Sequence, residues 1–249
     1  MNAARFLPPL FGGAFVVALW SAAVTFLDVP DYLLPTPWSV AQSIIAGFAD
    51  GSLWPHIWAT VEASLLGLAL GGGGAFLLGV LLAEQKLFER VLYPLVTALQ
   101  AVPKVALAPL IMVWFGFGLE SRVVLVMLIC FFPLFVSTVS GIRGADPDLV
   151  DLCRVSCASR WFIFRHVKLP GAANGIFVGL QVATSLALIG AVVGEFVASQ
   201  RGLGYLIASS GANMSIATMF GGVTLLALLG IGGTEAVRWV HRRVVFWQT

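Results

Sequence analysis

Charged side chains are scarce in this chain. Lysine, arginine, aspartate and glutamate make up 10% of the 249 residues, whereas soluble domains carry about 25%. The 14 basic and 12 acidic side chains could not cover the surface of a water-soluble domain of this length. Together with 59% hydrophobic residues and a mean hydropathy of +0.96, this shortage excludes a soluble globular protein and predicts a membrane protein.

Motifs for nucleotide, metal or nucleophilic chemistry are also missing. No G-x-x-x-x-G-K-[ST] loop is present, so the chain cannot cradle a nucleotide phosphate in that way. The three histidines are scattered, with no nucleophile and base placed as in a hydrolase. Cys130, Cys153 and Cys157 suggest neither a disulfide framework nor a metal site. We therefore expect no catalytic residue, no bound cofactor or metal, and no nucleic-acid partner.

Six apolar stretches are long enough to cross a bilayer as helices, which takes about 20 residues. They cover residues 5–28, 62–84, 91–116, 122–143 and 168–195, and a last stretch from about residue 216 after a polar lead-in. The third stretch holds Pro94, Pro103, Pro109 and Lys104, so we do not expect a straight, lipid-facing helix there. The sequence predicts an all-α polytopic membrane protein with six transmembrane helices. The first stretch could alternatively be a cleaved secretory signal, which would leave five.

Lysine and arginine are distributed unevenly between the loops. If the amino terminus lies inside, almost all basic residues fall on the cytoplasmic side, and only Arg122 and Arg201 fall outside. This asymmetry predicts that both termini are cytoplasmic.

The most polar long stretch, DLVDLCRVSCASRWFIFRHVKLP, covers residues 148–170. Asp146, Pro147 and Asp148 are helix start signals, and Ala158 and Ser159 suggest a break, so we expect one or two short helices. Two interpretations are open. The segment is either an amphipathic helix lying at the membrane interface or a docking element for a cytoplasmic partner.

Several motifs carry a resemblance to a known family. They occur in the order LLPTPWSV (33–40), QAVPKVALAPLIMVWFGFGLESR (100–122), RVSCASRWFIFRHVKLP (154–170), ALIGAVVGEF (187–196) and GLGYLI (202–207). Over roughly residues 33 to 240 the chain resembles ABC importer permeases of the nitrate, sulfonate and taurine class. In that family the central segment is the EAA loop, which forms a cytoplasmic coupling helix that enters a groove on the ATPase.

The resemblance implies an organisation and a set of partners. It implies an N-terminal transmembrane helix (1–30), an extracytoplasmic connection (31–56), a five-helix permease core (57–240) with a cytoplasmic coupling loop (143–170), and a cytoplasmic tail (241–249). The implied partners in a bacterial-type inner membrane are a second permease copy, two cytoplasmic ABC ATPases that bind ATP and Mg, an extracytoplasmic solute-binding protein, and lipid. The residues implied to couple to the ATPase are Asp151, Leu152, Cys153, Arg154, Cys157, Ala158, Leu169 and Pro170.

The coupling loop departs from the family pattern at two places. Asp151, Leu152 and Cys153 stand where Glu-Ala-Ala is usual, and Cys157 stands where glycine is usual. A side chain at Cys157 costs about 1 to 3 kcal/mol if the backbone there is left-handed. Either the turn differs, or the paired ATPase surface has adjusted.

Five polar residues are candidates for the substrate pathway or its gate, because ionisable groups at membrane depth are costly to place there. They are Lys104, Gln100, Glu62, Gln181 and Glu195. Lys104 could alternatively pair with Glu62 or a backbone carbonyl, or lie in a hydrated interfacial turn. Structural roles are open for the others as well.

A row of small residues in the second stretch predicts close helix contacts. Gly67, Gly71, Ala75 and Gly79 recur at every fourth position, the small-xxx-small spacing of packed membrane helices. Packing is the expected role, and a hinge is the alternative.

The solute is open at this level. The motifs QAVPKVALAPL, IGAVVGEF and TVEASLLGLALG look most like permeases for thiamine-related pyrimidines or riboflavin, while nitrate, taurine and alkanesulfonate importers share much of them. An alternative of another class is an ion-conducting or scaffold protein whose central loop lies on anionic lipid.

Overall fold

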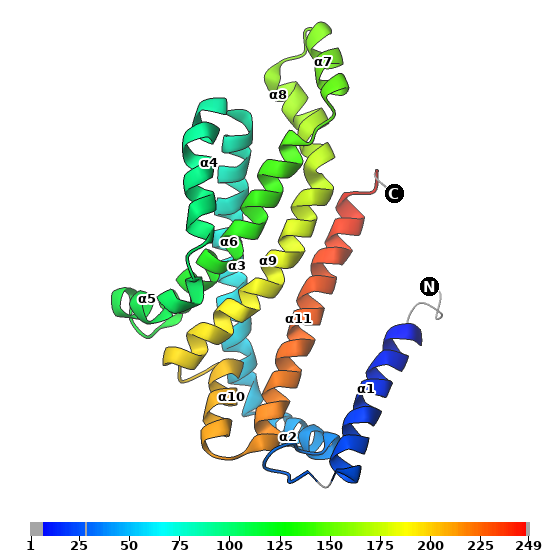
Figure 1. Ribbon diagram of the computed structural model, residues 1–249, viewed down its shortest axis with the longest axis vertical. Coiled ribbons are helices and arrows are strands. Elements are labelled where there is room, and N and C mark those ends of the chain that lie inside the picture. The colour runs from blue at the N-terminus through cyan, green and yellow to red at the C-terminus, as the bar shows by residue number, and fades with distance from the viewer. Residues whose placement is uncertain (1–6, 28, 248–249) are drawn as a thin grey trace. The chain divides into compact units, whose positions relative to one another are not determined.

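The computed structural model describes residues 7–27 and 29–247, and every regular element in this part of the chain is helical. The chain divides into two compact units: one holds the residues up to Ala59 with Arg201–Ala227, and the other holds Thr60–Gln200 with Leu228 onward. The long helices α3 (Leu53–Glu84) and α11 (Ile216–Val244) each contribute to both units (Figure 1).

The first unit contains α1 (Leu7–Phe26), α2 (Pro37–Ala49) and α10 (Leu203–Ala212), together with the first turns of α3 and α11. Thr36 starts α2, because its hydroxyl accepts a hydrogen bond from the Ser39 N–H at 3.1 Å. Farther along α2, Ser43 donates to the Ala217 carbonyl on α11 at 3.1 Å. The segment expected as a polar lead-in is itself a helix, α10, whose Leu203 and Gly204 are buried.

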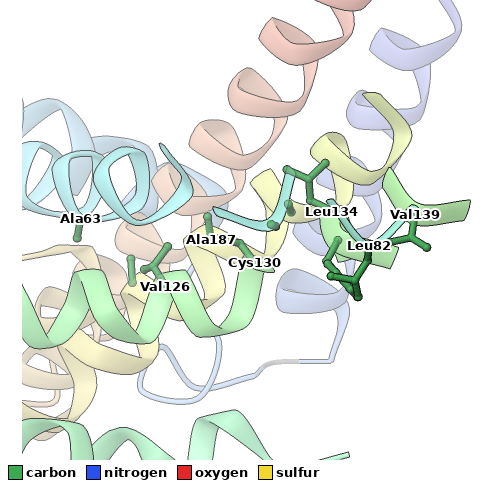
Figure 2. Close-up of a cluster of buried hydrophobic side chains, with 11 residues drawn as sticks. Ala63, Leu82, Val126, Cys130, Leu134, Val139 and Ala187 are labelled. Carbon is green, nitrogen blue, oxygen red and sulfur yellow. The ribbon is translucent and has the colours of Figure 1, made fainter. Parts of the chain in front are cut away.

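The second unit is built around α6 (Leu119–Arg143) and α9 (Leu169–Ala198), which pack against each other and against α3. Its core joins large side chains of α6, such as Val126 and Phe135, to the small Ala183 and Ala187 of α9. Figure 2 shows members of this cluster on α3, α6 and α9. Alternating large and small side chains let these helices approach closely.

The glycine row on α3 contacts α6 directly. A methyl group built on Gly71 would lie 2.7 Å from the Met127 Cα, and one on Gly67 would lie 2.4 Å from the Val126 Cβ. A methyl group built on Gly79 would lie 2.9 Å from the Thr138 Cβ. The prediction that this row forms a helix contact is confirmed.

Gly71→Ala is expected to destabilise the protein by about 1–3 kcal/mol, because the new methyl group meets backbone atoms that cannot turn away. The matched control is Gly73→Ala on the same helix, where a methyl group meets nothing within 4 Å. Thermal unfolding in detergent compares the two. Equal melting temperatures for both variants would contradict the packing role of Gly71.

Four helical runs in the described part are long and apolar enough to span a membrane: α3, α6, residues 160–197 and α11. A bent pair, Tyr93–Gln100 with Lys104–Phe115, makes a fifth if its halves count as one span, and the bend is 82°. The fold is therefore an all-α polytopic membrane protein. The expectation that residues 91–116 are not one straight helix is confirmed, and the physical reason is the proline content of this stretch.

Shorter apolar helices accompany these spans. They are Phe11–Phe26, which belongs to α1 and to the first predicted stretch, and Leu203–Ala212. The count of six spans stays a prediction.

Candidate functional site

The coupling segment, residues 143–170, follows α6 directly. Its first helix, α7 (Pro147–Val155), begins where the sequence predicts, since the Asp146 carboxylate accepts a hydrogen bond from the Asp148 N–H at 2.9 Å. A second short helix, α8 (Arg160–Ile163), begins with Ser159, whose hydroxyl accepts from the Phe162 N–H at 3.2 Å. The prediction of one or two short helices with a break at Ala158 and Ser159 is confirmed, and the number is two.

A left-handed residue ends α7. Cys157 has φ 57°, its N–H donates to the Arg154 carbonyl at 3.0 Å, and the Ala158 N–H donates to the Cys153 carbonyl at 2.9 Å. These bonds form a Schellman motif, in which glycine is usual at the position of Cys157. The turn is thus a left-handed one in spite of the side chain, which leaves adjustment of the partner surface as the remaining alternative.

Cys157→Gly is expected to raise the free energy of unfolding by about 1 kcal/mol, because glycine removes the contact between Cβ and the following carbonyl. Ser156→Gly is the control, since Ser156 has φ −77° and gains nothing from glycine there. Thermal unfolding measures both variants. A lower melting temperature for Cys157→Gly would contradict the strain assigned to this turn.

One face of α7 is open to solvent. Leu149, Leu152 and Val155 are 50%, 62% and 84% exposed, respectively, although all three are apolar. Val150 is buried and seats the helix on the rest of the protein. On the exposed side Asp151 accepts a hydrogen bond from Arg154 at 2.9 Å, and both side chains are about two-thirds exposed.

A polar cleft of about 710 Å³ separates α7 and α8 from the end of α3. Glu84 lines it from α3, Arg154 from α7 and Arg160 from α8. Lys168, at the end of the segment, also lines the cleft, and its Nζ lies 2.6 Å from the Glu84 Oε1. Sequence reasoning did not single out Glu84 or Lys168, although each charge borders a predicted span.

Two of the predicted coupling residues lie elsewhere. Leu169 and Pro170 begin α9 and line an apolar groove of about 290 Å³ with Phe76, Phe177 and Trp247. They therefore belong to the membrane-spanning body, whereas Asp151, Leu152 and Arg154 are presented to solvent.

Glu195 is the most buried of the predicted pathway residues. Its side chain is fully covered, and its Oε1 accepts a hydrogen bond from the Thr60 hydroxyl at 2.8 Å. The Arg122 Nη1 lies 3.9 Å from the same oxygen, and the Arg122 Nε donates to the Gly118 carbonyl at 3.3 Å. This group joins α3, α6 and α9. Sequence reasoning did not identify Thr60 and Arg122 as partners of Glu195, although a carboxylate among apolar helices needs a cation or a hydrogen-bond donor.

Lys104 begins the short 3-10 turn η2 (Lys104–Leu107), which leads into α5 (Ala108–Phe115). Its Nζ donates to the Gln100 carbonyl at the end of α4 (Lys86–Gln100) at 3.0 Å and lies 4.3 Å from the centre of the Phe132 ring. Of the alternatives for Lys104, the structure thus shows pairing with a carbonyl.

The two remaining candidates lie on other helices. Glu62 on α3 and Gln181 on α9 are both half-buried, and the Gln181 carbonyl accepts from the Ser185 hydroxyl at 3.5 Å. The structure thus brings Lys104 to Gln100 and places Glu195 in a separate group with Arg122 and Thr60. A role of these residues in solute passage stays a prediction.

Comparison with protein families finds one that covers most of this architecture. The model of the family described as "Binding-protein-dependent transport system inner membrane component" matches residues 75–246. These residues include the coupling segment, the helices around it and the Glu195 group except Thr60.

Curated proteins and a solved structure are similar over nearly the whole chain. The riboflavin transport system permease protein RibX of Chloroflexus aurantiacus is 37% identical over 94% of this chain and 87% of its own length. The formylaminopyrimidine transport permease protein ThiX of Halalkalibacterium halodurans is 30% identical over 97% and 96%, and the putative aliphatic sulfonates transport permease protein SsuC of Bacillus subtilis is 30% identical over 94% and 85%. A chain of the inward-facing MetNI methionine ABC transporter is similar in fold, with a TM-score of 0.60 at 19% identity, over 86% of this chain and 98% of that chain.

Proposed function

Since this chain belongs to the family of binding-protein-dependent ABC importer permeases, we propose that its coupling segment docks on a cytoplasmic ATPase and that its solute is a riboflavin-like or thiamine-related heterocycle. The chain is a non-catalytic, multi-pass subunit of the inner membrane. An ion-conducting or scaffold role is set aside by this membership.

The exposed face of α7 is the observation that carries the docking proposal. Contiguous apolar surface that faces water usually marks a place where a partner binds. Leu149, Leu152 and Val155 supply that surface, and the exposed carboxylates of Asp148 and Asp151 occur on the same short helix. With Arg154 counted, α7 has two carboxylates and one guanidinium; anionic lipid does not attract this net negative charge, so the face suits a protein partner better than the membrane surface.

The complete transporter in this proposal contains two permease copies, two ATPases that bind ATP and Mg, and an extracytoplasmic solute-binding protein. Both termini and the coupling segment lie on the cytoplasmic side. ATP-driven closure of the ATPases moves the docked α7, and the spans change between two conformations. No solute specificity is assigned to the coupling segment.

The pathway proposal rests on two places where polar groups meet the spans. Lys104 lies beside the 82° bend, where its Nζ donates to the Gln100 carbonyl, so a cation is held at the point where the helix is broken. Glu195 holds α9 to Arg122 on α6 and to Thr60 on α3, so its separation from them would open a passage between these helices. Gln100, Glu62 and Gln181 complete the proposed polar lining.

Asp151→Lys is expected to lower the stimulation of ATP hydrolysis by the solute-loaded binding protein by about tenfold or more. In the docked complex, the ATPase groups that contact Asp151 would be complementary to a carboxylate and would repel a lysine. The lysine would also repel Arg154, whose charge Asp151 now neutralises. The measurement is ATP hydrolysis by the transporter purified through a tag on this chain. Arg90→Glu, another exposed charge reversal on the cytoplasmic side but outside the coupling segment, is the control. A wild-type chain that purifies without any ATPase, or full stimulation in Asp151→Lys, would overturn the docking proposal.

The heterocycle proposal is tested on the solute-binding protein that accompanies this permease. It follows from the similarity to RibX and ThiX, while SsuC keeps sulfonates as the second candidate, and nitrate and taurine belong with it. Calorimetric titration with riboflavin, a formylaminopyrimidine, taurine and an alkanesulfonate separates these classes. Binding of the sulfur compounds alone would overturn the assignment.

A further inference from the structure

An ion pair joins the coupling segment to a helix that does not adjoin it in the sequence. Lys168 is the last residue of the π-helical turn η3 (Phe164–Lys168), and Glu84 is the last residue of α3. Their charged atoms lie 2.6 Å apart, although the residues are 84 positions apart in the chain. We propose that this ion pair is a mechanical link that transmits movement of the coupling segment to α3. The proposal rests on the docking function proposed above.

A covalent route already connects the coupling segment to α9. Residues 160–197 form one continuous helical run of 38 residues, which includes α8, the π-helical turn and α9. The turn keeps its backbone bonded, because the Leu169 N–H donates to the Phe164 carbonyl. Movement of α8 therefore passes to α9 through the backbone, whereas it reaches α3 only through side-chain contacts.

Apolar packing holds α3 against α6 up to the cytoplasmic end, where Leu82 is fully buried in the same core as Phe135 and Val139. This packing is non-directional, and it joins α3 to α6 without joining it to the coupling segment. A directional, charge-assisted bond between Lys168 and Glu84 fixes the register at the point where the segment would move.

The surroundings of the pair suit a link that forms and breaks. Both side chains are partly exposed, Lys168 by 22% and Glu84 by 28%, and both line the 710 Å³ polar cleft. Water in the cleft can solvate the two charges when they separate, so neither is left uncompensated in lipid. For the same reason single charge reversals should still fold.

The test is a reciprocal charge reversal in the complete transporter, reconstituted with its ATPase and binding protein in proteoliposomes. Lys168→Glu and Glu84→Lys should each lower the solute transported per ATP hydrolysed by about fivefold. The double variant restores the pair with opposite polarity and should return to within about twofold of wild type. Glu235→Arg with Arg238→Glu, singly and together, is the control, because it changes an ion pair within α11 alone.

The outcomes separate coupling from stability and from docking. Single variants that melt earlier but transport normally per ATP would overturn the proposal and leave the pair a purely structural role. A double variant no better than the single ones would also overturn it. The variants leave the exposed face of α7 unchanged, so they should keep the ATPase bound. A wild-type chain that purifies without the ATPase would instead contradict the docking proposal.

Discussion

Glu195→Ala is expected to lower the free energy of unfolding by about 3–5 kcal/mol, the largest stability effect expected of any single substitution proposed for this protein. The reason is the position of Arg122, whose side chain is 13% exposed and whose Nη1 lies 3.9 Å from the lost carboxylate. Among the described residues this Nη1 has no hydrogen bond to replace that interaction. The Thr60 hydroxyl also loses its acceptor. Chemical unfolding in detergent measures the loss.

A double variant separates the cost of an unpaired charge from the value of the pair. The double variant Arg122→Leu with Glu195→Met should recover most of the lost stability, because no charge is then left buried without its partner. Glu62→Ala is the matched control, since Glu62 is only half-buried on the same membrane body. A loss in Glu195→Ala no larger than that in Glu62→Ala would contradict the structural account of this group.

Leu152→Glu is expected to weaken association with the ATPase by about 30-fold or more, the larger of the two functional effects on α7. A hot-spot side chain at the centre of an interface contributes about 2 kcal/mol or more, that is, about this factor, and the introduced carboxylate would in addition lose its hydration on docking. Leu152 is 62% exposed in the isolated chain, so the substitution should leave the fold unchanged. The measurement is the amount of ATPase that co-purifies with the chain over a series of dilutions.

Two variants control for charge and for hydrophobicity. Phe246→Glu introduces the same charge at another exposed apolar residue, 72% exposed, and should keep the ATPase bound. Leu152→Met preserves an apolar side chain of similar volume and should bind nearly as well as wild type. Unchanged association in Leu152→Glu would show that the partner does not use this face.

The local features of the fold could be predicted because neighbouring residues determine them. Asp146 and Pro147 mark the start of α7 in the sequence and in the structure. The prolines between residues 91 and 116 mark a span that bends by 82°, and the small residues of α3 mark its contact with α6. In each case the signal lies in the same short stretch of sequence as the feature that it predicts.

The ionic partners could not be predicted, because tertiary packing alone brings them together. Nothing near Glu84 in the sequence indicates Lys168, and nothing near Glu195 indicates Arg122 or Thr60. The α10 helix was also missed, since the glycine and serine residues in that segment obscured its buried face. For Cys157 the sequence left two alternatives open, a different turn or an adjusted partner surface, and the backbone forms the left-handed Schellman turn.

The continuous helix from Arg160 to Val197 is longer than a bilayer crossing requires. At about 1.5 Å per residue, its 38 residues extend roughly 57 Å, while the hydrocarbon core of a bilayer is only about 30 Å thick. The run is longer than one crossing even when a helix is tilted, so its first residues, in α8, extend beyond the hydrocarbon. In the proposed transporter this length carries α8, and α7 before it, into water, where a soluble ATPase can bind them.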